Sequence, residues 1–297
     1  MKKHLRTALA LVIVALTIAI FIYYVHKHPD TIKRLGDISP LVLVALLGVY
    51  ALSFLAYVAI TRYSLQLFDK TLSKQENLLF NAYSSLINFF GPGQSGPAFR
   101  AIYLKKRHNL SLKRYALTGL IYYGFFAVVS VGMAFAGSRP WWQTTLVMFV
   151  TMAVSIWFIR RYRNKLGNAT KVNMRLAGLI GLMTAAQIIM QVFIFAIELR
   201  SISGGISWGQ VISYTGVANL ALFASITPGG IGIREAFLLF SEQLHHIGSA
   251  TVVAASVVDR GVYLLFLGVL FVLVITMHAK DKLQVTKGDA DTGATPE

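Results

Sequence analysis

The feature that most constrains this chain is a series of long apolar segments that recur along nearly its whole length. One helical crossing of a hydrocarbon core about 30 Å thick needs roughly 20 apolar residues. Six segments meet this requirement: residues 7–25, 41–61, 115–136, 141–159, 176–197 and 249–277. With 56% hydrophobic and 13% charged residues, the chain has too little polar surface for a soluble fold. We therefore predict an all-α polytopic membrane protein with six transmembrane helices.

The strongly basic balance, +16 at pH 7, raises the possibility of nucleic-acid binding, but the placement of the charges argues against it. Lys and Arg lie in short clusters between the apolar segments, where they act as topology signals and contacts for anionic lipids. Lys2, Lys3 and Arg6 precede an apolar run without a small-residue cleavage site, which we interpret as a retained first span. Because cysteine is absent, disulfides and thiolate chemistry are excluded.

Two further apolar segments, residues 77–105 and 207–247, are interrupted by proline and glycine. If each crossed once, the basic clusters at 100–114 and 160–175 would face outward, against the rule that Lys and Arg collect in the cytoplasm. The first arm, 77–91, would extend only ~22 Å at ~1.5 Å per residue. Both segments are therefore predicted to be re-entrant hairpins, with both chain termini in the cytoplasm of a bacterium and the spans in its plasma (inner) membrane.

The two hairpins share the pattern PGxxG, which indicates an internal repeat. The first repeat, residues 1–136, holds two spans, the hairpin 77–105 and one span. The second, residues 137–279, holds two spans, the hairpin 207–247 and one span, and a polar cytoplasmic tail follows at 280–297. Starting on opposite sides of the membrane, the repeats have the inverted topology of many secondary transporters. Alternatively, proline and glycine only shape kinks here.

The sequence around the second pattern, TPGGIGIREAF preceded by Asn219, resembles the signature of the lysylphosphatidylglycerol synthase transmembrane-region family, also called flippase-like or UPF0104. The upstream FFGPGQSGPAFRAIYL matches the family's first motif more loosely. The resemblance implies a multi-span domain that moves lipids or lipid-linked groups between leaflets. The full synthase adds a soluble aminoacyl-transferase domain after the membrane region, whereas only residues 280–297 follow here. We therefore expect no enzyme activity.

Four charged residues lie within apolar segments, where each costs about 2.5–3.5 kcal/mol on insertion scales. Arg234 and Glu235 follow the second PGxxG turn, while Asp259 and Arg260 lie inside the last span. We expect both pairs to face a common cavity. Arg234 or Arg260 would bind an anionic head group, and Glu235 or Asp259 would neutralise the empty site or carry a proton. The alternative is that Glu235–Arg260 and Arg234–Asp259 are structural ion pairs that lock hairpin to span.

Other polar and turn residues complete the predicted substrate path. Arg100 follows the first turn and is either the counterpart of Arg234 or another cytoplasmic anchor. Glu198, next to Arg200, is expected to be an interfacial charge, and Gln187 and Gln191 to join helices. Beyond the four charges, the predicted path residues are Pro92, Gly93, Gly96, Arg100, Asn219, Pro228, Gly229, Gly230 and Gly232.

These features favour a transporter of an anionic or phosphate-bearing lipid. The alternatives are an ion-coupled small-solute transporter and an accessory protein that presents lipid to a membrane enzyme. A membrane enzyme would need clustered Asp, Glu or His at one interface, and the sequence contains no such cluster. The adjacent His245 and His246 do not have the i, i+4 spacing of a helical zinc pair, so we expect neither metal nor cofactor. The expected partners are anionic membrane lipids, with no nucleic acid.

Overall fold

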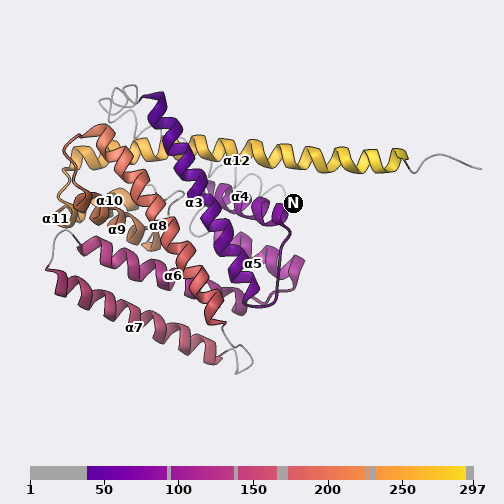
Figure 1. The fold of residues 1–297 in the computed structure, drawn as a ribbon, viewed down its shortest axis with the longest axis horizontal. Coiled ribbons are helices and arrows are strands. Elements are labelled where there is room, and N and C mark those ends of the chain that lie inside the picture. Colours follow the sequence, from indigo (N-terminus) through magenta and orange to yellow (C-terminus); the bar gives the residue numbers. More distant parts are fainter. Residues whose placement is uncertain are drawn as a thin grey trace, which may run out of the picture.

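A computed structural model describes residues 39–91, 95–136, 140–165, 173–224, 227, 230 and 232–291. All regular structure in these ranges is α-helix or 3₁₀-helix (Figure 1). The predicted first span, 7–25, and the path residues Pro92, Gly93, Pro228 and Gly229 lie outside them. The helices are α3 (Pro40–Gln66), α4 (Lys74–Phe90), α5 (Ser95–His108), α6 (Leu112–Phe135), α7 (Trp141–Lys165), α8 (Met174–Ile202), α9 (Trp208–Ala224), α10 (Ile233–Phe240), α11 (Glu242–His245) and α12 (Ser249–Asp291).

Five of the described helices are long and apolar enough to cross a membrane, which confirms the predicted fold class. They are Pro40–Gln66, Leu112–Phe135, Trp142–Tyr162, Met174–Ile202 and Ser249–Met277. Each contains one of the predicted spans, apart from offsets of a residue or so at an end. The starts of three follow from capping, since the side chains of Ser39, Ser111 and Asn173 accept hydrogen bonds from backbone N–H groups of the first turn. Helix α12 continues to Asp291, beyond the predicted end of the last span.

Two pairs of shorter helices lie between the long ones. Helices α4 and α5 pack against each other, as do α9 and α10. The 17 residues of α4 and of α9 extend each helix only ~25 Å at ~1.5 Å per residue, and α5 and α10 are shorter still. The order of a long helix, a short pair and a long helix therefore occurs twice, in α3–α6 and in α8–α12. We call α4–α5 the first hairpin and α9–α10 the second.

The long helices α3 and α8 pack along each other most extensively, and α12 packs against both of them (Figure 1). Helix α9 packs closely on α6, where a Cβ atom on Gly216 would lie 2.2 Å from the backbone nitrogen of Ala134. Any residue with a Cβ atom would clash here, so only glycine lets α9 approach α6 this closely. The contact holds the second hairpin against the first half of the chain. Helix α7 lies outside the bundle and packs on α6.

The outer faces of the long helices are apolar. Large hydrophobic side chains such as Leu41, Phe149 and Val272 are exposed, and none of the residues in the apolar window of α7 is buried. An exterior of this kind would aggregate in water but is stable in hydrocarbon. The polar groups that are buried collect around the two hairpins, which is where the site lies.

Candidate functional site

The turn that opens α10 is held by glycine conformations and by one carboxylate. Gly230 and Gly232 have φ of 69° and 83°, in the left-handed region that side chains rarely adopt. The backbone N–H of Gly232 donates to Oε2 of Glu235 at 2.7 Å. Glu235 therefore caps the helix in which it lies, where the dipole of the first turn favours a negative charge. This explains why the IGIRE part of the motif ends the turn and starts the helix.

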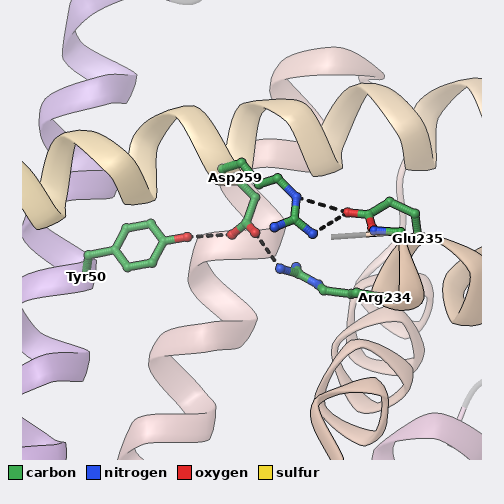
Figure 2. A network of polar contacts seen from close by, with 6 residues as sticks. Tyr50, Arg234, Glu235 and Asp259 are labelled. Atoms are coloured by element: carbon green, nitrogen blue, oxygen red, sulfur yellow. Dashed lines mark hydrogen bonds and ion pairs between the residues drawn. The ribbon is translucent and has the colours of Figure 1, made fainter. Parts of the chain in front are cut away.

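Both predicted ion pairs are formed, and they connect the second hairpin to the last span (Figure 2). Nη1 of Arg234 donates to Oδ2 of Asp259 at 2.5 Å, and Tyr50 on α3 donates to the other carboxylate oxygen, also at 2.5 Å. Nε and Nη2 of Arg260 donate to Oε1 of Glu235 at 3.1 and 2.6 Å. Because all four charges are nearly buried and mutually neutralised, the network joins α3, α10 and α12 without a net charge.

Arg234 keeps hydrogen-bonding capacity beyond its pair with Asp259. Its guanidinium carbon lies 5.0 Å from the centroid of the Phe195 ring on α8. Its Nε and Nη2 atoms have no hydrogen-bond partner among the described residues. Arg234 can therefore accept a further anionic or carbonyl ligand without first leaving Asp259.

A cavity of about 530 Å³ lies between the two hairpins, and we call it the hairpin cavity. Asn88 and Pro97 line it from the first hairpin, and Asn219, Gly230 and Arg234 from the second. Its polar wall also includes Asp259, Arg260 and Tyr263 on α12, Gln191 on α8 and Tyr50 on α3. The predicted common cavity therefore exists, although Glu235 lies behind its wall and not in it.

Two amides in this wall each have one atom without a partner among the described residues. Nδ2 of Asn219, a residue only 2% exposed, and Oε1 of Gln191 make no hydrogen bond among the described residues. An unbonded buried amide costs free energy that a ligand in the cavity would recover. Gln187, in contrast, accepts from the Tyr122 hydroxyl at 3.0 Å and joins α8 to α6 as expected. Both glutamines line the hairpin cavity, but the side-chain oxygen of Gln187 is already bonded and that of Gln191 is not.

Residues 7–270 match the family described as the lysylphosphatidylglycerol synthase TM region. The chain belongs to this family. The family links it to lipid handling in a membrane and confirms the resemblance drawn from the motifs. No curated protein matches the chain.

In this member of the lysylphosphatidylglycerol synthase transmembrane family, neutral groups hold the two helices of the first hairpin together beside the turn. Gly96 lies so close to α4 that a Cβ atom there would be 2.7 Å from Cβ of Asn88. The Asn88 amide oxygen accepts from the Gly96 N–H at 3.2 Å, and the Ser95 hydroxyl donates to the Ile87 carbonyl at 2.8 Å. These contacts tie the start of α5 to α4 and place Pro97 in the cavity wall.

Arg100 is buried in this hairpin, so the interpretation as a cytoplasmic anchor is wrong. Its side chain is 6% exposed and donates to Oγ of Ser84 and to Oδ1 of Asn81, each at 2.7 Å. An interfacial anchor would extend its charge into water, whereas this guanidinium is held in the interior. Arg100 does not line the hairpin cavity, so the structure does not bring it together with Arg234.

The expectation that Glu198 is an interfacial charge is also wrong. Glu198 is fully buried, and neither carboxylate oxygen has a hydrogen-bond partner among the described residues. It interacts electrostatically with Arg234 and Asp259. Its position seven residues after Gln191 puts both on one face of α8, which was the sequence signal that could have found it. The neighbouring Arg200 suggested a membrane surface instead.

Two titratable groups outside the spanning helices have structural roles in this family member. Burial disfavours the charge on Glu76, but hydrogen bonds from Tyr103 and His108, each 2.7 Å long, outweigh this and lower its pKa. Burial lowers the pKa of His245. Nδ1 of His245 accepts from the Ile247 N–H and Nε2 contacts the Leu238 carbonyl, which specifies a neutral ring protonated at Nε2. His245 therefore links the end of α10 to the segment that leads into α12.

Proposed function

We propose that this protein moves an anionic or phosphate-bearing lipid between the leaflets of a bacterial plasma membrane. The head group would pass through the hairpin cavity while the hydrocarbon chains stay in the bilayer. In this proposal the two hairpins are re-entrant, the halves of the chain are inverted across the membrane, and both termini are cytoplasmic. The chain itself catalyses no reaction.

The observation that carries the proposal is the wall of the hairpin cavity. It contains an arginine with unbonded donor atoms, two amides with one unbonded atom each and a tyrosine–aspartate pair, contributed by the second hairpin and by α3, α8 and α12. A polar cavity inside an apolar bundle gives a head group a route that the hydrocarbon core denies it. Family membership supports lipid as the cargo.

The charge network explains how the empty cavity is stable. Without a ligand, Asp259 neutralises Arg234, and Glu235 neutralises Arg260. An arriving phosphate would first bond to the free Nε and Nη2 of Arg234 and to Nδ2 of Asn219. Because the phosphate competes with Asp259 for the guanidinium, it displaces a carboxylate that is still held by the Tyr50 hydroxyl. The return of Asp259 to Arg234 would release the phosphate, which keeps binding reversible.

Leaflet exchange of labelled lipids in liposomes containing the purified protein tests this proposal. The panel contains phosphatidylglycerol, a zwitterionic phospholipid and a polyprenyl phosphate. The variant Asn219→Leu removes an unbonded donor from the cavity without breaking a described hydrogen bond, so the protein should fold. We expect at least about tenfold slower exchange, from the loss of one hydrogen bond to a charged group.

The matched control is Ser130→Ala, since the Ser130 hydroxyl is also buried without a partner among the described residues but does not line the hairpin cavity. It should exchange lipid like the wild type. Equal loss in both variants would mean that the assay reports general damage. Absence of exchange above empty liposomes, with and without a pH gradient, would overturn the proposal and favour a small solute or an accessory role.

A further inference from the structure

The first hairpin contains a buried positive charge without a negative partner. Arg100 donates to Ser84 and Asn81, its guanidinium carbon lies 4.1 Å from the centroid of the Tyr57 ring, and the Tyr115 side chain is a further hydrogen-bond partner. All four partners are neutral. None of the three ion pairs found in the described part of the chain includes Arg100. Burying an uncompensated charge is costly, and such charges in membrane proteins usually serve a ligand.

Arg100 lines a second cavity, of about 810 Å³, which we call the Arg100 cavity. Its walls come from α3, α5, α6 and α7, with Phe80 from α4, and they are dominated by aliphatic and aromatic side chains such as Ile60, Leu104, Leu120 and Trp157. The only other charged residue in the described lining is Arg161, which is also basic. A ligand that matches this cavity has one anionic group and a substantial apolar part.

The two cavities are adjacent, since Tyr57, Pro97, Tyr122 and Tyr123 line both. An anion held at Arg100 would therefore be separated from the polar wall of the hairpin cavity by a rim of three tyrosines and one proline. Aromatic rings with hydroxyl groups suit such a border, because they contact hydrocarbon and still hydrogen-bond to a head group.

We infer that the Arg100 cavity is a binding site for an anionic phospholipid, with the phosphate at Arg100 and an acyl chain along the apolar wall. The identification of the ligand as a membrane lipid rests on the proposed function. A guanidinium already fixed by Asn81 and Ser84 is preorganised for a phosphate, and a net negative ligand supplies the missing counter-charge. A zwitterionic phospholipid has no net negative charge and fits less well.

Native mass spectrometry of the full chain in detergent tests the site by counting bound molecules. Phosphatidylglycerol, phosphatidylcholine and inorganic phosphate are titrated separately. We expect phosphatidylglycerol to bind the wild type most tightly, and Arg100→Gln to weaken this binding at least about tenfold, the loss of a charge-assisted bond. Tight binding of free phosphate in place of lipid would overturn the lipid assignment, and undiminished lipid binding by Arg100→Gln would overturn the site.

A second variant tests whether an acyl chain occupies the apolar wall of the Arg100 cavity, and it keeps Arg100 and its hydrogen bonds intact. A Cβ atom on Gly119, in the wall of the Arg100 cavity, would meet only Cδ2 of Tyr123, at 3.9 Å. Gly119→Phe therefore fills the cavity without a backbone clash and should also weaken lipid binding about tenfold. The matched control is Gly178→Phe, because Gly178 is exposed on α8 and a Cβ atom there meets nothing within 4 Å. Equal binding by both phenylalanine variants would show that no chain occupies the cavity.

Leaflet exchange measured on the same preparations separates this inference from the proposed function. Lipid bound at Arg100 in a wild type that exchanges no lipid would refute the transport proposal and leave the site in place. If the wild type exchanges lipid, and neither Arg100→Gln nor Gly119→Phe weakens lipid binding, the proposed site is refuted and the transport proposal stands.

Discussion

The first and second hairpins differ in how each handles a buried arginine. At the second, Arg234 of the hairpin and Arg260 of the adjoining α12 each have a carboxylate, and the carboxylate of Asp259 is also held by a tyrosine. In the first, Arg100 has only amide, hydroxyl and aromatic partners. The same backbone plan therefore supports one charge-neutral network and one unneutralised cation. A repeated order of helices need not be a repeat in electrostatics.

The difference assigns the two hairpins different tasks. A paired arginine stabilises the fold until a ligand competes for it, whereas an unpaired arginine attracts an anion from the start. In the proposed path, a lipid would associate with the first hairpin through Arg100 and meet the paired charges of the second in the adjacent cavity.

The largest expected effect comes from breaking the ion pair between Arg234 of the second hairpin and Asp259 of α12. Asp259→Asn leaves Arg234 buried with no carboxylate, which should cost about 3–5 kcal/mol of unfolding free energy. Titration of the purified protein with a denaturing detergent, followed by circular dichroism, measures this loss. The double variant Asp259→Asn, Arg234→Gln should recover part of it, because no unpaired charge then remains.

The control for that prediction lies in the first hairpin. Arg100→Gln removes a buried cation and leaves no carboxylate unpaired. The lost hydrogen bonds to Asn81 and Ser84 are partly offset because an unpaired charge is no longer buried, so the net cost should be at most about 1.5–3 kcal/mol. If Asp259→Asn proves no more damaging than Arg100→Gln, the contrast between a paired and an unpaired arginine is wrong.

Sequence reasoning could predict the spans and the ion pairs that join the second hairpin to the last span, but not the environment of the other charges. Apolar windows about 20 residues long specify a crossing almost irrespective of context. Four charges in otherwise apolar segments leave few ways to pair, so Arg234–Asp259 and Glu235–Arg260 could be anticipated. Tyr50 could not, because it joins Asp259 across 209 residues of sequence.

The burial of Arg100 and Glu198 could not be predicted for a related reason. Each lies near other basic residues, which in a membrane protein usually indicates the interface. Their burial results from neighbouring helices: α4 supplies Ser84 and Asn81 around Arg100, and α8 packs on α3 around Glu198. Long-range packing of this kind leaves little trace in local composition.

An intermediate effect is expected at Glu198, the one buried carboxyl near the second hairpin that has no hydrogen bond in the described structure. Tyr50, Tyr214, Arg234 and Asp259 surround it electrostatically, yet none bonds to it. Glu198→Leu removes a desolvated polar group and should stabilise the fold by roughly 1–3 kcal/mol. Glu198→Gln, which keeps an unbonded polar group, should change stability less. Destabilisation by Glu198→Leu would show that the carboxyl has a partner, and that the second half holds a third neutralised charge.

The smallest effect belongs to the exposed end of the first hairpin, where Glu76 on α4 accepts hydrogen bonds from Tyr103 and His108 on α5. The pKa of Glu76 is lowered in the folded protein from its ordinary value of 4.5, so its contribution is fully present above pH 4.5 and is lost as the pH falls through the lowered value. Glu76→Gln should therefore lower stability by less than about 1 kcal/mol at neutral pH, as for other partly exposed pairs. Thermal unfolding followed between neutral and acid pH should show the wild-type and variant curves converge below pH 4.5. A gap that persists in acid would mean that Glu76 acts through packing and not through its charge.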